Sequence, residues 1–202
     1  MIESAHIPVV TALRAQGGDR VAVDLDGRRW RIVPLEAVYV AGLSVGAPLH
    51  RTAARALGRE LRRLEARHSA LRALRFRDHT VASLEQRLCE VGAAPSDRRE
   101  ALEAAQRSGL VDDRRLAVNR AEVLAGRGVG DDGIVADLER QGVGAEDIRR
   151  ALGVLEREMS RALEILERRG RSSRTVRHLA AKGFSEETIE QIVADVAADA
   201  VA

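Results

Sequence analysis

The constraint that most limits how this chain can fold is an internal repeat with a period of fifty residues. A pattern of two apolar residues followed by a glycine marks one helix and its end. This pattern occurs twice, and the two copies align without a gap. Its members are Leu84, Leu88 and Gly92, followed by Ile134, Leu138 and Gly142. A third, shorter copy contains a helix that Gly183 closes. Self-similarity at a fixed period of this size predicts stacked helical units, each too small to bury its own apolar face.

The repeat predicts an all-α fold, with tandem three-helix repeats in an elongated array and a small N-terminal β-hairpin extension. The predicted boundaries are residues 1–50 for an N-terminal tail and β-hairpin extension, 51–108 for helical repeat 1, 109–155 for helical repeat 2 and 156–202 for helical repeat 3. Asp112-Asp113 and Asp131-Asp132 are expected to begin helices, where a carboxylate favours the positive end of the helix dipole. The apolar positions from Ile148 to Leu166 continue without interruption, which favours one helix joining the second repeat to the third.

A β-hairpin is expected in the extension. Two runs of β-forming residues flank Asp26-Gly27, which suits a type I′ turn because both of its central residues need positive φ. Val21 and Val23 alternate on the first run, so they share one face of it. We expect Trp30 and Ile32 to lie opposite them on the second run. The segment before the hairpin, residues 1 to about 18, has no period and is expected to be a loose tail.

The first long helix is expected to begin near Thr52 and to carry an apolar stripe. The stripe consists of Leu57, Leu61, Leu64, Leu71 and Leu74. Arg55, Arg59 and Arg62 lie about 180° away from it at 100° per residue, so they should be exposed. Because the stripe looks self-contained, we expect the helical array to fold without residues 1–50.

Arginine dominates the charge of the chain, in which Lys182 is the only lysine. The net charge is only +2, which is too low for a protein that wraps nucleic acid. Two local clusters stand out, from Arg51 to Arg77 and from Arg168 to Lys182, and together they favour binding to a polyanion or an acidic protein over a purely solvated face. The candidate binding residues are Arg55, Arg59, Arg62, Arg72, Arg168, Arg169, Arg171 and Arg174. Aromatic residues are only 2% of the chain, which argues against base stacking, so single-strand readout is not expected.

The sequence contains no pattern typical of an enzyme. The five histidines are scattered without metal-ligand spacing, so neither a catalytic residue nor a metal or cofactor site is expected. Cys89, the single cysteine, is expected to be a buried small hydrophobe rather than a nucleophile. One cysteine, an N-terminus unlike a signal peptide and no long apolar run favour a cytoplasmic protein without a membrane segment.

Two stretches of the sequence resemble the RecX family of recombination regulators. They are ALRALRFRDHTVASLEQRLCEVG and GLVDDRRLAVNRAEVLAGRGVGDDGIVADLERQGV. The positions that align with the family motif are Gly109, Leu110, Asp112, Asp113, Leu116, Ala117, Gly130, Ile134, Leu138, Gly142 and Val143. The resemblance covers about residues 70–197; Leu116 departs from it, because the family usually has an aromatic residue there.

The resemblance implies a non-enzymatic regulator of homologous recombination and DNA repair. Such proteins bind the RecA–single-stranded DNA filament and inhibit its extension, strand exchange and ATP hydrolysis. The implied partner is therefore the RecA filament, with single- or double-stranded DNA as a further candidate and a monomer as the expected state. A DNA-binding protein with helix-turn-helix-like trihelical units is the alternative, and a passive scaffold is a third class.

Overall fold

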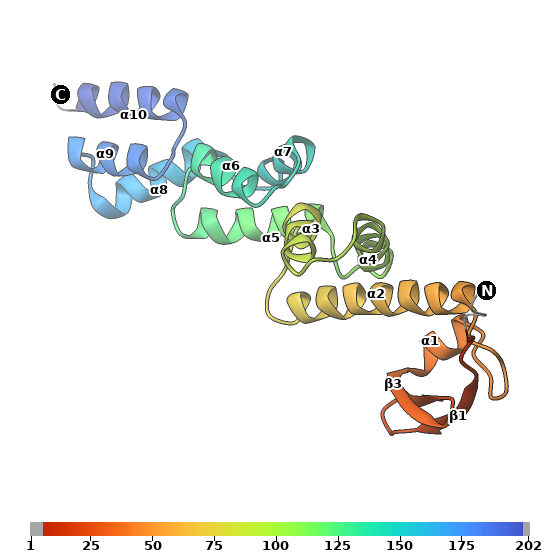
Figure 1. The fold of residues 1–202 in the computed structure, drawn as a ribbon. Coiled ribbons are helices and arrows are strands. Elements are labelled where there is room, and N and C mark those ends of the chain that lie inside the picture. The colour runs from red at the N-terminus through yellow and green to blue at the C-terminus, as the bar shows by residue number, and fades with distance from the viewer. Residues whose placement is uncertain (1–5, 200–202) are drawn as a thin grey trace. The chain divides into compact units, whose positions relative to one another are not determined.

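The structure is a computed structural model that describes residues 6–199 (Figure 1). As predicted, the described chain is mostly helical with a small antiparallel sheet near its N-terminus. The strands are β1 (Val10–Ala15), β2 (Arg20–Leu25) and β3 (Arg28–Pro34). The helices are α1 (Leu35–Val40), α2 (Arg51–Leu74), α3 (Val81–Glu90), α4 (Pro95–Arg107), α5 (Asp113–Gly126), α6 (Asp131–Arg140), α7 (Ala145–Gly153), α8 (Glu158–Arg169), α9 (Ser173–Ala181) and α10 (Glu186–Asp199).

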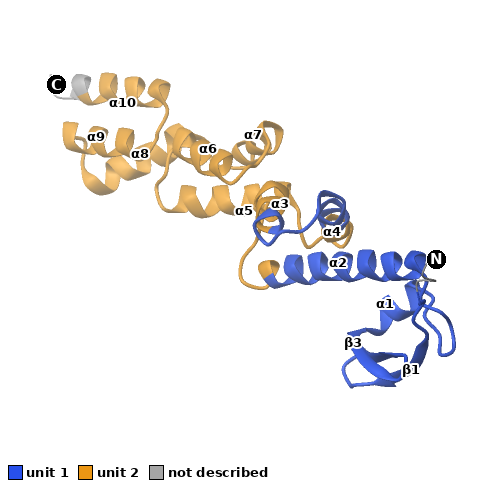
Figure 2. Cartoon of the chain, viewed as in Figure 1, with its two compact units in different colours: residues 1–72, 88–103 blue, residues 73–87, 104–202 orange. Residues whose placement is uncertain are grey.

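The chain forms two compact units, which Figure 2 colours separately. The first contains residues 1–72 and 88–103, and the second contains residues 73–87 and 104–202. Residues 1–5 and 200–202, which belong to the predicted tail and to helical repeat 3, lie outside the described residues. The boundaries predicted from the repeats stay a prediction, because a repeat is a recurring pattern whereas a compact unit is a region of dense contacts.

The predicted hairpin is present, but the sheet contains a third strand. β2 and β3 pair antiparallel around Asp26 and Gly27, whose φ angles of 49° and 77° meet the requirement of the turn. The prediction of a loose tail over residues 1–18 is wrong for Val10–Ala15, which forms β1 and pairs antiparallel with β2. A third strand completes the ladder of β2 on its open edge, which stabilises a hairpin that would be marginal alone.

One face of this sheet is covered and the other is open. Val21 pairs with Val33, and both pack with Val38 of α1 in one buried cluster. The expectation that Ile32 lies opposite the valines is therefore wrong: Ile32 pairs with Ala22, on the opposite face, and Trp30 falls at the register shift between Arg29 and Arg31. Side chains alternate between the two faces of a strand, so a shift of one residue in register moves a side chain to the other face.

The apolar stripe of α2 packs against the N-terminal residues. Leu57 and Leu64 form a buried cluster with Ala37 of α1, and Leu61 packs against this cluster and that of the sheet. The expectation that the stripe is self-contained is therefore wrong. Its C-terminal part is also misplaced, since Leu71 is exposed.

The second unit contains α5 to α10, and its helix starts follow the sequence signals. Thr80 Oγ1 accepts the amide of Ser83 at the start of α3, and Asp112 Oδ1 accepts the amide of Arg115 at the start of α5. The predicted continuous helix from Ile148 is wrong, because α7 ends at Gly153 and α8 begins at Glu158. Two buried clusters fill the unit. Their fully buried members include Ile134, Leu138 and Ala151 in one, and Ala162, Leu179 and Ile192 in the other.

A set of contacts joins the start of α3 to two later segments of the same unit. Val81 donates its amide to Asp113 Oδ1, the first residue of α5, at 2.9 Å. Thr80 Oγ1 donates to Gln141 O at 2.5 Å. Gly142 follows in the turn after α6, where a β-carbon would lie 2.7 Å from Ala82 Cβ. The close approach therefore requires glycine at this position.

A similar set of contacts occurs at the start of α6, fifty residues later in the chain. Asp131 donates its amide to Glu158 Oε1, the first residue of α8, at 2.6 Å. Gly130 and Gly133 donate their amides to the carbonyls of Lys182 and Gly183, in the turn after α9. In both places, a carboxylate from the start of one helix and a glycine turn meet the amino end of another helix, where backbone amides lack partners within the helix.

Glu158 is the most completely bonded of these carboxylates. Besides the amide of Asp131, it accepts the Ser185 amide at 3.1 Å and the Thr188 hydroxyl at 2.7 Å. Burial alone would raise the pKa of Glu158, but the hydrogen bonds from Ser185, Asp131 and Thr188 outweigh burial and hold its pKa below the ordinary value. The ionised network stabilises the fold above the ordinary glutamate pKa, and this contribution is lost as the pH falls through the lowered pKa.

Arg161 completes this junction from the next turn of α8. Its guanidinium donates to Val129 O at 2.9 Å and to Glu156 O at 3.1 Å, and it forms an ion pair with Asp131. The same group lies over the ring of Phe184, 5.9 Å from the centroid. Arg161 is buried, and its charge is compensated by these partners.

We expect Gly130→Ala to destabilise the protein by about 1–3 kcal/mol or more, as overpacking does. A β-carbon there would lie 2.2 Å from Phe184 Cα, so the backbone around Phe184 must move. Gly144→Ala is the matched control: Gly144 is also an N-cap glycine with negative φ, and nothing lies within 4 Å of its β-carbon position. Urea unfolding of both variants measures the difference, and equal losses would contradict the close packing at Gly130.

We expect deletion of residues 1–50 to lower the free energy of unfolding, because it exposes Leu57 and Leu64. Each buried leucine contributes about 1.5–3 kcal/mol, so the loss should be several kcal/mol. Ala37→Glu in the full chain is the companion variant, since it keeps the segment but disrupts the same contact. Denaturant melts of the three proteins test this expectation; unchanged midpoints would mean that α2 is stable by itself.

Candidate functional site

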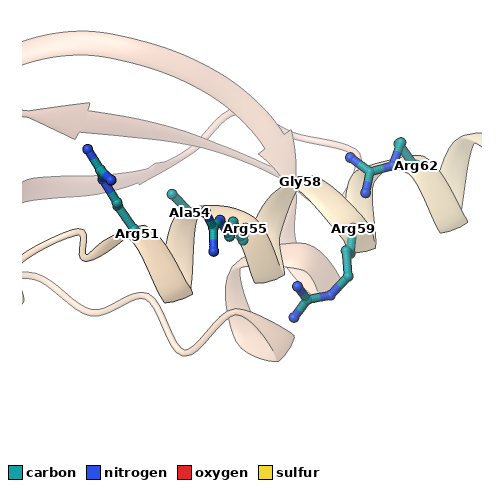
Figure 3. Close-up of a pocket in the computed structure, with 6 residues that line it drawn as sticks. All are labelled: Arg51, Ala54, Arg55, Gly58, Arg59 and Arg62. Carbon is teal, nitrogen blue, oxygen red and sulfur yellow. The ribbon is translucent and has the colours of Figure 1, made fainter.

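The first candidate surface is a row of arginines along α2. Arg51, Arg55, Arg59 and Arg62 come from successive turns of the helix and line a shallow hollow of about 650 Å³ (Figure 3). Gly58 lies between them, so the floor of the hollow is free of side-chain bulk. We call these four residues the α2 arginine row. Among the described residues, no carboxylate pairs with Arg51, Arg55 or Arg59, so their guanidinium donors face solvent.

The other arginines of the first cluster have structural partners. Arg63 and Arg67 both pair with Glu100 of α4, and Arg63 also pairs with Glu60 of α2. Arg72 pairs with Glu65 and donates to Ser69 Oγ, so part of its positive charge is compensated within α2. These arginines are occupied in holding α2 and its neighbour, so the cluster is less basic than its arginine count indicates.

Arg62 differs from Arg55 and Arg59, although all three were expected to be exposed. Its side chain is exposed, as predicted, but Nε lies 3.8 Å from Oδ2 of the buried Asp97. Arg55 and Arg59 are therefore the residues of the row that can be changed without disturbing α4.

The second candidate surface surrounds the turn between α8 and α9. Arg168 and Arg169 line a hollow of about 310 Å³ with Arg127 and His178. Arg169 and His178 also line an adjacent hollow of about 400 Å³, together with Arg174. The structure thus brings Arg168, Arg169 and Arg174 together, whereas Arg171 of the same turn lines neither hollow.

His178 reports on this basic environment. Partial burial lowers its pKa, and the positive charges of Arg169 and Lys182 lower the pKa further. The imidazole is therefore held in its neutral form at neutral pH, where it can accept or donate one hydrogen bond. Protonation of His178 becomes easier when an anion enters the hollow and offsets the arginine charges.

Three residues of these surfaces were not among the sequence candidates: Arg51, Arg127 and His178. Arg51 lies one turn before Arg55, and this i, i+4 spacing was the available signal. Arg127 and His178 lie fifty-one residues apart in the sequence, and no local pattern joins them. Their proximity depends on how α5, α8 and α9 pack.

Other expected features have simpler outcomes. The expectation that Cys89 is buried is wrong: it is exposed, because it follows the buried Leu88 by 100° around α3. Within residues 6–199, no group of three His, Cys, Asp or Glu side chains is placed to hold a metal ion. None of the helices in this part of the chain is long and apolar enough to cross a bilayer.

Comparison with known proteins settles the family. The chain is 40% identical over 106 residues to the regulatory protein RecX of Syntrophotalea carbinolica (strain DSM 2380 / NBRC 103641 / GraBd1). The matched region covers 52% of this chain and 68% of the relative. The chain belongs to the RecX family. No family model matches it. The relative is called a regulatory protein, and this chain is thus a RecX-type regulator.

Two RecX crystal structures share the fold. A structure of regulatory protein RecX superimposes with a TM-score of 0.74 and 22% identity, over 92% of this chain and 98% of the other. RecX from Lactobacillus salivarius gives a TM-score of 0.58 and 18% identity, over 67% of this chain and 96% of the other. At these identities the similarity concerns the fold, and the mostly helical architecture with a small sheet is that of RecX.

We expect Arg169→Ala to raise the pKa of His178, because it removes a cation that disfavours the imidazolium. Arg174→Ala is the control, since Arg174 lines the same hollow but is not among the charges that lower the pKa of His178. An NMR titration of the His178 ring measures both variants. A pKa that does not move in Arg169→Ala would contradict this arrangement of charges.

Proposed function

We propose that this chain binds the RecA–single-stranded DNA filament and inhibits its extension, strand exchange and ATP hydrolysis. Membership of the RecX family supports a regulatory role in recombination and DNA repair. The observation that carries the choice of surface is the α2 arginine row, in which Arg51, Arg55 and Arg59 have no carboxylate partner among the described residues. A row of unpaired guanidinium groups on one helix suits a negatively charged filament, whether phosphate or acidic side chains form the contact.

We further propose that the helices form three tandem three-helix repeats, made of α2 to α4, α5 to α7 and α8 to α10. The recurrence of the Val81–Asp113 hydrogen bond as Asp131–Glu158 supports this division. A glycine turn accompanies both contacts, at Gly142 and at Gly183. Repeated units can offer several weak contacts to a filament that is itself a repeat of subunits, and linked weak contacts multiply in affinity.

The second basic surface, formed by Arg168, Arg169 and Arg174, is a further candidate contact in this proposal. Arg72 and Arg171 contribute less, because Arg72 already has partners within α2 and Arg171 lines neither hollow. The α2 arginine row therefore remains the first surface to test.

The alternative is a DNA-binding protein that competes with RecA for the strand. The two functions differ in stoichiometry, because a filament regulator acts below a one-to-one ratio to RecA whereas a competitor must saturate the DNA. A passive scaffold would change neither property. The decisive measurement is RecA-dependent ATP hydrolysis on single-stranded DNA as the protein is titrated in.

We expect Arg55→Glu/Arg59→Glu to raise the concentration for half-maximal inhibition at least about tenfold, which corresponds to about 1.4 kcal/mol. Stability should change little, because both side chains are exposed and surface substitutions usually stay within about 0.5 kcal/mol each. Arg99→Glu/Arg114→Glu is the matched control, since it makes the same change in net charge at two exposed arginines outside the candidate surfaces.

The salt dependence of inhibition identifies the partner of the row. If Arg55 and Arg59 contact DNA phosphates, each loss should reduce the log–log salt slope by roughly 0.7–0.9. Contacts to acidic protein residues also weaken with salt but do not follow that relation. An inhibition curve that the double variant shares with wild type would exclude the α2 arginine row and leave the Arg168–Arg174 surface as the candidate.

A further inference from the structure

The open face of the N-terminal sheet carries a surface of a different kind. Directly paired residues of antiparallel strands lie on the same face, so the register identifies two rows across the sheet. One row is Arg14, Ala22 and Ile32, and the next is Ala12, Asp24 and Arg29. Trp30 lies at the irregularity of β3 beside the second row, two residues before Ile32. Trp30 and Ile32 are 42% and 39% exposed, while the core around Val21, Val23 and α1 fills the opposite face.

The arginines of this face are held in place by a buried carboxylate. Asp24 is only 4% exposed, and its Oδ2 lies 3.1 Å from Arg14 Nη2 while its Oδ1 lies 3.7 Å from Arg29 Nε. A guanidinium has five N–H donors, so each arginine keeps donors that do not face Asp24. Both side chains remain about half exposed or more, at 62% and 49%. The face therefore presents partly exposed guanidinium donors beside a buried carboxylate.

Two more arginines lie near Trp30 and Ile32, although Arg31 pairs with Val23 and so belongs to the register of the covered face. Arg31 places Cζ 6.0 Å from the centre of the Trp30 ring. Arg20 donates from Nη2 to Ile32 O at 3.5 Å. The single acidic side chain of the two rows is the buried Asp24, so the charge that an approaching ligand meets beside Trp30 is positive.

We propose that this open sheet face binds single-stranded DNA, with Trp30 stacking on a base and Arg14 and Arg29 contacting the neighbouring phosphates. An exposed indole surrounded by guanidinium groups matches a ligand that alternates flat π surfaces with negative charges. A duplex fits poorly, because its bases are stacked on each other and their faces are not available. The choice of DNA over RNA rests on the proposed function, whereas the stacking site rests on the geometry alone.

The scarcity of aromatic residues limits this site rather than excluding it. A strand held along a track of stacked bases needs several aromatic side chains, which the composition rules out. One indole on a sheet face can hold one base, and the arginines can hold the backbone beside it. The proposed site is therefore short and adds to other contacts with the strand.

The first test uses the fluorescence of the full chain without RecA. Trp30 is the only tryptophan, so its emission reports on this face alone. We expect a short oligothymidylate to quench the emission in a saturable way at low salt. A duplex and a strand made only of abasic sites should quench much less, since neither offers a free base to the indole.

The second test measures affinity through the anisotropy of a labelled oligothymidylate. Trp30→Ala should weaken binding about 5- to 150-fold, which is the range for loss of one stacked base. Trp30→Phe should recover part of the loss because it restores an aromatic ring. Tyr39→Ala is the matched control, since Tyr39 is an 86% exposed aromatic residue on α1, which covers the other face of the sheet.

Several results would overturn the proposal. Wild-type emission that no oligonucleotide changes would remove the site, as would equal quenching by the abasic strand, which would leave charge without stacking. Quenching by RecA alone would assign the face to a protein partner, and a response to oligouridylate but not to oligothymidylate would exclude DNA. If oligothymidylate does not quench Trp30 but the protein still inhibits RecA, this site fails and the proposed function stands. If Trp30 is quenched but RecA is not inhibited, the site stands and the proposed function fails.

Discussion

The fold of the second unit depends on how the amino ends of its helices are satisfied. The first amides of a helix have no partner within it, and burying them unpaired is costly. Here a carboxylate that begins another helix accepts one such amide, as Asp113 does for Val81 and Glu158 does for Asp131. A glycine turn completes the contact, because only a backbone without a β-carbon approaches closely enough. One interaction thus fixes both where a helix begins and what packs against it.

Several arginines also satisfy structural partners within the fold. Arg161 binds two carbonyls, a carboxylate and the ring of Phe184, and Arg63 and Arg67 converge on Glu100. Such residues cannot be told from binding residues in a list of charges, because the sequence does not give their partners. What separates Arg55 and Arg59 from them is the absence of a carboxylate within reach among the described residues, and only packing reveals that.

Local signals predicted the local features well. The positive φ angles at Asp26-Gly27 and the helix starts at Asp112-Asp113 and Asp131-Asp132 each depend on a few adjacent residues. The errors lie where tertiary contacts decide. β1 has no strong pattern of its own and forms because β2 offers an edge. The face of Ile32 depends on register, and the break between Gly153 and Glu158 interrupts a pattern that apolar spacing alone continues. The second candidate surface was predicted only in part. Arg168 and Arg169 are adjacent in sequence, whereas Arg127 and His178 join them only through tertiary packing.

The α2 arginine row and the open sheet face belong to the same compact unit and differ in how they can hold an anion. Arg55 and Arg59 are unpaired, so they attract charge at long range but lose side-chain freedom when they bind. Arg14 pairs with Asp24 and Arg29 lies near it, so part of their charge is neutralised before they bind. A strand that contacts both would meet the second site at a high effective concentration once the first is occupied. In the proposed function, two surfaces that are weak alone would then suffice for a chain of net charge +2 to bind a polyanion.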